Sequence, residues 1–390
     1  MNIIFYRYNS ICEPDYIEAF KKIGINVIED KDGSNFQIDV QEKIMNLGEI
    51  IAREKPMFVF SINFFPLVSR VCDRIGVKYL TETVDCPVFE IYHSEIRNTC
   101  NNVFLFDYAQ YLSVKNENPN GIFYLPLGAP VERVSSLLGN EKKYKYDISF
   151  VGSLYNEKDP FMNLKISEPS RIKLQELMEK QILEEPCGIN YIKENLLEKD
   201  IAELKRDGCS NPFVGTIENI DTFVAINNYL TYHMAYMERV RYLNKLAEEF
   251  GEGVVNIFTG SMSNELSCGV DLHDSVKTLT EMPFVFRQSK INLNITMRSI
   301  QTGIPQRVWD VMACRGFLLT NYQPELEEYF DVGTHLETFC SYEELKEKAM
   351  YYLSHDAERE KIAHNGYEEV KEKHSVVNRV MSMIRMVSTK

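Results

Sequence analysis

The sequence contains no apolar run long enough to cross a lipid bilayer. A membrane-spanning helix needs roughly 18 or more consecutive apolar residues, and polar residues interrupt every apolar stretch well before that length. The first apolar segment, residues 2–6, is short, and no basic region precedes a long apolar run as it does in an export signal. We therefore expect a protein with neither a transmembrane segment nor a signal peptide.

Positive charge is also scarce. The chain has 43 Lys and Arg against 57 Asp and Glu, which gives a formal net charge of −14. This balance argues against a nucleic-acid partner and against binding to an anionic membrane surface. Any phosphate group that the protein binds must therefore be held by a local group of basic residues.

The sequence lacks the usual signatures of a metal site. Its nine cysteines form no C-x-x-C pair and have no histidine at zinc-binding spacing. No D-x-D motif stands in a loop suited to holding a diphosphate through a metal, and Asp271-Leu272-His273-Asp274 is not that motif. An odd number of scattered cysteines without an export signal favours reduced thiols and a cytoplasmic location.

The first part of the chain alternates short strands with helices. Such alternation with short connections predicts parallel strands joined by right-handed crossovers, so residues 1–135 are expected to form a Rossmann-like domain. The G-x-G-x-x-G loop of the usual dinucleotide site is absent. The predicted strands are 2–6, 26–29, 57–61, 78–81, 103–106 and 122–124, and the main helices are 16–23, 40–54 and 67–75.

Two loop residues of this domain are candidates for catalysis. Ligands of such sheets bind beyond the carboxyl ends of the strands, where Asp85 follows the predicted strand 78–81. Asp85 could orient an acceptor hydroxyl group or act as a base. The alternative is an aspartate that opens the turn before Pro87. His93, just beyond this loop, is the second candidate.

A second domain is predicted over residues 146–375, after a linker at 136–145. Its first strand runs into Gly152 and Ser153, where the backbone can approach a ligand closely. The alternative is a plain strand-ending turn. Residues 165–250 are expected to be helical, with Arg239 and Arg241 on the surface or one of them reaching the cleft. Gly366 is interpreted as the end of a later helix.

The most informative stretch runs from residue 289 to residue 330. Apolar residues alternate with asparagines over 291–295, which predicts a half-buried strand. Pro305 suits the start of a helix, and the chain breaks again at Gly316. A short buried strand is expected to follow at 317–320.

Three polar residues make the helix after Pro305 unusual. Its free N–H groups could bind a phosphate, and Arg307 could add two hydrogen bonds to the phosphate oxygens. Gln306 and Asp310 share a face, and Asp310 could accept hydrogen bonds from two neighbouring sugar hydroxyls. This pattern fits a nucleoside diphosphate. The alternative is an ordinary surface ion pair between Arg307 and Asp310.

The segment RVWDVMACRGFLLTNYQPELEEYF, with Tyr342-Glu343-Glu344-Leu345 and Tyr351-Tyr352-Leu353 after it, resembles the CgeB-like, spore-maturation type glycosyltransferases. These resemble, more distantly, the group-1 glycosyltransferases. The resemblance implies an α/β, GT-B-like fold, with two Rossmann-like domains facing across a cleft. Asp310 stands where the family usually has Glu, and it is expected to hold the ribose.

The resemblance also implies roles for further residues. Gly152 and Ser153 would face the donor diphosphate, and Phe258, Thr259 and Phe284 would lie near the base. Arg298, which follows a strand, could contact phosphate at the same place. The last helix, residues 376–390, would pack back on the first domain.

The sequence thus predicts a bacterial hexosyl- or N-acetylhexosaminyltransferase that uses a nucleotide-sugar, most readily a UDP-sugar. The acceptor would be a glycan, a protein or a small molecule. Leaving-group charge would be stabilised by Arg307 and the helix N-terminus, so no obligatory metal and no cofactor are expected. The alternatives are a nucleotide-sugar epimerase and a non-catalytic sugar- or nucleotide-binding protein on the same fold.

Overall fold

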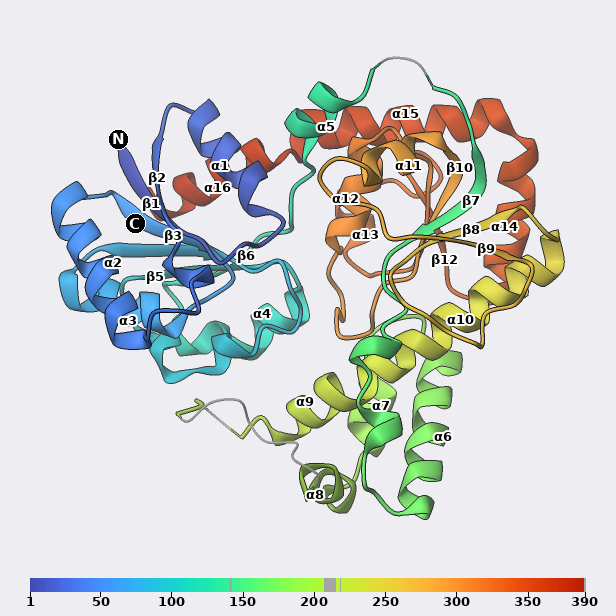
Figure 1. Ribbon diagram of the computed structural model, residues 1–390, viewed down its shortest axis with the longest axis horizontal. Helices are drawn as coiled ribbons and strands as arrows, with labels where there is room; N and C mark the ends of the chain where they lie inside the picture. The colour runs from blue at the N-terminus through green and yellow to red at the C-terminus, as the bar shows by residue number, and fades with distance from the viewer. Residues whose placement is uncertain (140–141, 207–214, 218, 389–390) are drawn as a thin grey trace. The chain divides into compact units, whose positions relative to one another are not determined.

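The computed structural model describes residues 1–139, 142–206, 215–217 and 219–388. It divides into two compact units (Figure 1). The first contains Met1–Glu132, Pro212–Glu218 and Lys373–Lys390, and the second contains Arg133–Asn211 and Asn219–Glu372. In the described part of the chain, no helix is both long and apolar enough to cross a membrane.

The first unit is built on a six-stranded parallel sheet with the order β2-β1-β3-β4-β5-β6. The strand Phe58–Ile62 is buried at every position, as is typical of a parallel strand that is covered on both faces. The strands are β1 (Asn2–Tyr6), β2 (Asn26–Asp30), β3 (Phe58–Ile62), β4 (Lys78–Glu82), β5 (Asn101–Leu105) and β6 (Ile122–Tyr124), and the helices between them are α1 (Glu13–Lys22), α2 (Val40–Glu54), α3 (Pro66–Ile75) and α4 (Tyr108–Val114).

The last helix, α16 (Val376–Ser388), belongs to this first unit. Its apolar face joins the same hydrophobic core as α1 and β3. The backbone of residue 376 lies so close to Gly128 that a Cβ atom there would stand 2.9 Å from the Cα of Val376. The core residues that α16 contributes are Val376, Val380, Met383 and Val387.

The second unit contains another six-stranded parallel sheet, with the order β12-β11-β10-β7-β8-β9. Helices α10, α14 and α15 contribute to its core. The strands are β7 (Tyr146–Val151), β8 (Val255–Phe258), β9 (Val270–His273), β10 (Ser289–Asn294), β11 (Leu318–Asn321) and β12 (Glu337–Phe339), and the helices that pack on them are α10 (Thr231–Phe250), α11 (Met282–Gln288), α12 (Gln306–Ala313), α13 (Leu326–Tyr329), α14 (Tyr342–Ser354) and α15 (Asp356–Lys373).

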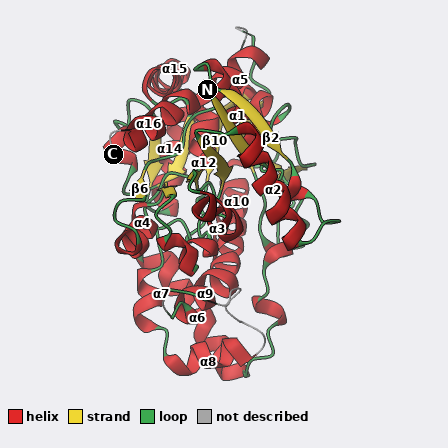
Figure 2. Cartoon of the chain, turned by 90° about the vertical axis from the view of Figure 1, so that its left-hand side faces the viewer, coloured by secondary structure: helices red, strands yellow, loops and turns green. Residues whose placement is uncertain are grey.

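A group of helices lies at one end of this unit, away from the sheet. Figure 2 shows these helices together with no strand among them. Residues 207–214 and 218 of the predicted helical segment, 140–141 of the predicted linker and 389–390 of the last helix lie outside the described residues. The helices are α6 (Glu168–Glu184), α7 (Asn190–Asn195), α8 (Glu198–Arg206) and α9 (Asp221–Ala225). A further helix, α5 (Val131–Leu137), ends just inside the predicted linker at 136–145.

The helix α15 departs from the sequence interpretation, because it does not stop at Gly366. It continues to Lys373, and Gly366 is buried in its interior. A Cβ atom at this position would stand 2.3 Å from the carbonyl oxygen of His335 and 3.0 Å from Cε of Met312. Gly366 is therefore required for a close crossing of chains and does not end the helix.

We expect Gly366→Ala to destabilise the second unit by about 1–3 kcal/mol, since the backbone of His335 must move to admit a methyl group. The matched control is Gly48→Ala in α2, where the added Cβ would meet only Cδ1 of Ile75, at 3.9 Å. There the better helix propensity of alanine should leave stability unchanged or raise it by up to about 1 kcal/mol. Urea unfolding measures both. Equal effects of the two substitutions would contradict the assignment.

Candidate functional site

The second unit has a pocket of about 300 Å³ at the carboxyl ends of β7 and β8. Ligands of open parallel sheets bind at this edge. The walls come from the segment after β7, the segment after β8, residues 275–278 and the first turns of α11 and α12. Five predicted donor residues line the pocket: Gly152, Ser153, Phe258, Thr259 and Arg307.

A carboxylate and two hydroxyl groups form one wall. Ser153 and Ser261 both donate hydrogen bonds to Glu157, the latter over 2.8 Å. The hydroxyl oxygens of the two serines also accept backbone N–H groups, from Tyr155 at 2.7 Å and Leu154 at 2.8 Å. Burial raises the pKa of Glu157, but hydrogen bonds from Ser153, its own backbone and Ser261 outweigh it and hold the pKa below its usual value. Glu157 is therefore charged at neutral pH and fixes this wall.

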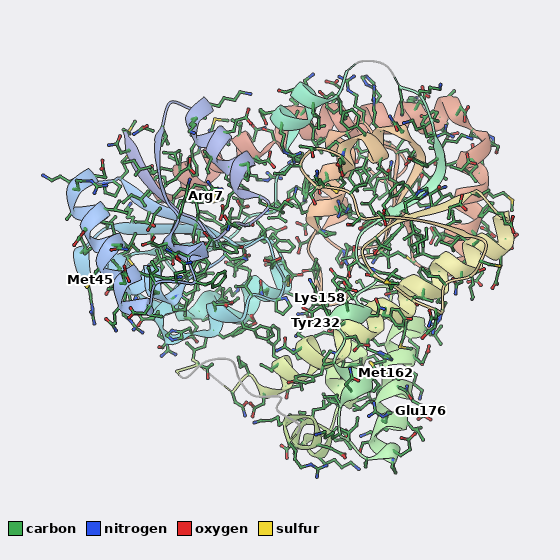
Figure 3. All side chains as sticks on the ribbon, in the orientation of Figure 1. Arg7, Met45, Lys158, Met162, Glu176 and Tyr232 are labelled. Atoms are coloured by element: carbon green, nitrogen blue, oxygen red, sulfur yellow. The ribbon has the colours of Figure 1, made fainter. Side chains whose placement is uncertain are left out.

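The sequence analysis missed Glu157 and Ser261. Aromatic rings pack close to Glu157. The Lys158 amine lies 5.8 Å from the centre of the Tyr155 ring, and the Tyr232 ring packs edge-on against the Tyr155 ring with centroids 5.6 Å apart. Figure 3 shows the labelled side chains of Lys158 and Tyr232 next to each other. The signal that could have identified Glu157 is its place just beyond the Gly-Ser end of a predicted strand.

Arg239 is not on the surface but supports the same wall, as the alternative interpretation of the two arginines allowed. Its side chain is buried and donates to the carbonyl oxygen of Ser153 at 2.5 Å and to that of Ile295 at 2.6 Å. Its guanidinium stacks on Tyr155 at 4.5 Å. Burial lowers the pKa of Arg239. Arg239 therefore ties the ends of β7 and β10 together.

The opposite wall is the first turn of α12. The Arg307 guanidinium contacts the sulfur of Met282, lies over the Phe286 ring at 5.3 Å and stands 3.5 Å from the carboxylate of Asp310. The amide of Gln306 donates to the other oxygen of Asp310 at 3.1 Å. Gln306 and Asp310 are thus held beside Arg307, but they do not line the pocket. The ion pair that the sequence left open as an alternative is present.

Of the two predicted aromatic donor residues, one lies outside the pocket. Phe284 lies in α11 with its side chain partly exposed, and Met282 lines the pocket instead, because the helix turns Phe284 to another face. Phe258 does line the pocket, and its ring stacks on His273 with centroids 4.5 Å apart.

Arg298 also differs from its predicted role. Its side chain is 3% exposed and pairs with Glu238 of α10 at 2.9 Å, and it donates to the carbonyl oxygen of Glu185 at 2.9 Å. These partners hold the guanidinium inside the unit, and Arg298 does not line the pocket. It joins the strand end to α10 and α6 in place of contacting phosphate.

In the first unit, the loops after β3 and β4 are joined through Asn63. Its amide donates to the carboxylate of Asp85 at 2.7 Å and to the Tyr8 hydroxyl at 2.9 Å, while its carbonyl accepts the N–H of Val84 at 2.9 Å. Asn63 has a φ of +58°, in the left-handed region that asparagine tolerates better than most residues. Asp85 is therefore anchored at the carboxyl end of the sheet, the edge where its predicted role requires it.

The second catalytic candidate, His93, lies between two short 3-10 turns. Its Nδ1 accepts the backbone N–H of Glu95 at 3.1 Å, so the neutral tautomer with the proton on Nε2 fits this contact. Burial lowers the pKa of His93, which keeps the ring neutral near pH 7. The His93 ring accepts its hydrogen bond from the backbone of Glu95, whereas Asp85 accepts one from the side chain of Asn63.

A buried carboxyl group lies at the end of β4. Glu82 is fully buried, and neither of its oxygens accepts a hydrogen bond of normal geometry. Burial raises its pKa to about 7, although Tyr16 and the charge of Arg379 act in the opposite direction. Among the described residues, no three His, Cys, Asp or Glu side chains come together as a metal site.

A known protein family matches the C-terminal part of the chain. Residues 239–385, which include α11, α12 and most of one pocket wall, match the model of a family described as "Glycosyl transferase-like". No curated protein sequence matches the chain.

Solved structures share the whole fold at low sequence identity. Sucrose-phosphate synthase from Thermosynechococcus elongatus has a TM-score of 0.52 and 10% identity, with 100% of this chain and 99% of that chain covered. A glycosyltransferase from Rickettsia africae gives 0.50 and 12%, covering 100% and 99%. HepE from Anabaena, solved with UDP-glucose, gives 0.50 and 9%, covering 100% of both chains.

These likenesses confirm the predicted fold class: two parallel α/β sheets with flanking helices, as in GT-B glycosyltransferases. The family match over residues 239–385 bears out the main functional prediction of a glycosyltransferase. The family match also supports the predicted relation to group-1 glycosyltransferases. The donor, the acceptor and the CgeB-like subtype belong to the proposed function.

Proposed function

We propose that the protein transfers a hexosyl or N-acetylhexosaminyl group from a UDP-sugar to an acceptor, as a CgeB-like glycosyltransferase. The observation that supports this most directly is the placement of Arg307. It lines a pocket at the carboxyl edge of the sheet, in the first turn of an eight-residue helix, within the region that matches the glycosyltransferase family. The solved structure of HepE contains UDP-glucose on the same fold.

The donor diphosphate would bind beside Arg307, with the backbone of Gly152 on its other side. The first-turn N–H groups of α12 and the guanidinium supply the positive charge that a departing diphosphate needs. Phosphate oxygens would also replace the contact between Arg307 and Asp310. This frees the Asp310 carboxylate, with Gln306 beside it, to accept hydrogen bonds from the ribose hydroxyls.

The negative charge of Glu157 makes the adjacent wall unsuitable for phosphate. A carboxylate that is fixed by two serines is instead a good acceptor for the hydroxyl groups of a sugar. We therefore assign the wall of Ser153, Glu157 and Ser261 to the transferred sugar or to the nucleoside, and Arg307 to the diphosphate. Phe258 and Thr259 would adjoin the same nucleoside.

Acceptor chemistry is assigned to the first unit. Asp85 would orient the acceptor hydroxyl or take its proton, with Asn63 fixing the carboxylate, and His93 would assist as a neutral imidazole. No metal takes part in this scheme, because Arg307 and the helix N-terminus carry the charge. The acceptor is a glycan, a protein or a small molecule.

Calorimetry with UDP and UDP-glucose in excess EDTA tests the donor site. We expect Arg307→Ala to weaken binding by about 1.5–3 kcal/mol, the range for hydrogen bonds to charged groups, and Asp310→Asn to weaken it as well. Arg241→Ala is the control, since Arg241 pairs with Glu179 and does not line the pocket. Unchanged affinity in Arg307→Ala, or binding that requires Mg²⁺ or Mn²⁺, would remove the proposed donor site.

The same protein preparations separate the alternatives. A transferase releases UDP when an acceptor is added, whereas an epimerase converts the sugar without net release of UDP. A binding protein does neither while still binding the nucleotide-sugar. Asp85→Ala should lower transfer and leave donor affinity nearly intact.

A further inference from the structure

A second cavity of the same unit contains an unusual concentration of positive charge. Its volume is about 220 Å³, below the range of roughly 300–1,000 Å³ typical of drug-sized ligands. It lies where α11 and α12 end, with one wall from α15. Its polar lining includes the side chains of Ser135, Arg287, Arg315 and Tyr367.

This cavity is separate from the donor pocket. Met282 and Arg307, at the starts of α11 and α12, line the donor pocket, whereas Arg287 and Cys314, at the ends of the same helices, line the basic cavity. A helix of eight residues is about 12 Å long, so the two cavities lie on the order of 10 Å apart. Figure 1 shows α15 running along the top of the unit next to α11, and Gly366 of α15 approaches Met312 of α12.

The charges around the cavity are mostly of one sign. Arg287 is 92% buried, Arg315 stands beside it, and Lys142 donates to the carbonyl oxygen of Arg315 at 3.4 Å. Burial lowers the pKa of Arg287, and the charge of Arg315 lowers it further. Burial likewise lowers the pKa of Lys142 to about 8, with Arg287 and Arg359 adding to the effect and Glu360 opposing it.

Hydroxyl groups complete the lining. The Tyr367 and Ser135 hydroxyl oxygens lie 3.3 Å apart, and Arg315 stacks over the Tyr367 ring at 4.3 Å. Burial raises the pKa of Tyr367, but Ser135 and Arg315 outweigh it and bring the pKa below its ordinary value. A guanidinium that stacks by its face can still donate hydrogen bonds along its edges.

The arginines are not needed to cap α12. The N–H groups of Cys314, Arg315 and Gly316 already donate to the last carbonyl oxygens of the helix, at 3.0–3.2 Å. Arg315 also holds a φ of +54°, which is costly for a side chain with a Cβ atom. Glycine would adopt this backbone conformation at lower cost, so the presence of arginine at this position points to a role for its guanidinium group.

We infer that this cavity is a binding site for a small oxyanion, a phosphate group that is free or carried by a small metabolite, held by Arg287, Arg315 and the hydroxyl groups of Ser135 and Tyr367. Two arginines offer the paired donors that phosphate oxygens accept best. The bound anion would offset the repulsion among Arg287, Arg315 and Lys142.

Calorimetry with inorganic phosphate and with a hexose phosphate tests the site, in an Arg307→Ala background so that the donor pocket does not contribute. We expect one molecule to bind per chain, and we expect Arg315→Gly to weaken this binding at least about tenfold, the loss of one charged hydrogen bond or more. Arg315→Gly removes the guanidinium while relieving the backbone, so the fold should survive. The probe that binds more tightly distinguishes free phosphate from a phosphorylated metabolite.

Lys55→Gly is the matched control, because Lys55 is another basic residue with a left-handed backbone, φ +47°, at the end of a helix in the first unit. It should leave anion binding unchanged. The inference is overturned if neither probe binds, or if Arg315→Gly and Arg287→Gln both retain the affinity of the background protein. Failure of the wild-type protein to bind UDP-glucose, together with intact phosphate binding at Arg315, would contradict the proposed function and leave this site standing.

Discussion

Arg298→Met is expected to destabilise the second unit by about 3–5 kcal/mol, the cost of leaving one member of a buried ion pair without its partner. The side chains of Arg298 and Glu238 are only 3% and 5% exposed, so the remaining carboxylate would be charged inside the protein. Urea unfolding followed by circular dichroism measures the loss. The size of the effect depends on burial, because water cannot replace the lost partner.

Two further variants isolate this cause. Arg298→Met combined with Glu238→Leu should recover most of the stability, since no unpaired charge then remains. Arg241→Ala removes another arginine that pairs with a glutamate and should cost less than about 1 kcal/mol, because its pair with Glu179 is 25% and 39% exposed. If the double variant is no more stable than Arg298→Met alone, the buried charge is not the cause.

The second large effect is a gain of stability in Glu82→Gln that appears only as the pH rises. The pKa of Glu82 is raised by burial to about 7 from an ordinary 4.5. Between these values the unfolded chain has lost the proton while the folded protein retains it, so the free energy of unfolding falls with rising pH. The separation corresponds to about 3 kcal/mol, all of it lost above the folded pKa.

Glutamine cannot ionise, so Glu82→Gln should match the wild-type free energy of unfolding near pH 4.5 and exceed it by up to about 3 kcal/mol at pH 8. Denaturant unfolding at a series of pH values measures the difference. Glu18→Gln, on the exposed side of α1, is the control and should not change this pH dependence. A constant difference between Glu82→Gln and wild type at all pH values would show that the proton is not involved.

The sequence predicted the periodic parts of the molecule well, because strand and helix patterns follow from local alternation of apolar residues. The strand 289–294 and the helix that starts at Gln306 are examples. Arg307 was placed at the pocket for the same reason. Its position depends only on the start of one helix at the edge of a parallel sheet.

Features that depend on contacts between distant segments were not predictable in this way. Arg298 was assigned to phosphate because a strand end suits that role, but its partner Glu238 lies 60 residues away. The role of Gly366 depends on the carbonyl oxygen of His335, which no local pattern identifies. The hydrogen bond from Ser261 to Glu157 similarly joins two strand ends that lie 104 residues apart in the sequence.

The placement of α16 affects how the protein folds while the ribosome is synthesising it. The first 132 residues emerge early and can pair all six strands of their sheet, but the helix that covers Phe20 and Phe58 is made some 240 residues later. Because translation adds about 5–20 residues per second, the apolar face of the nascent sheet stays uncovered for on the order of ten seconds or longer. Chaperones that bind exposed apolar surface would find their target here, on the third of the chain that was synthesised first.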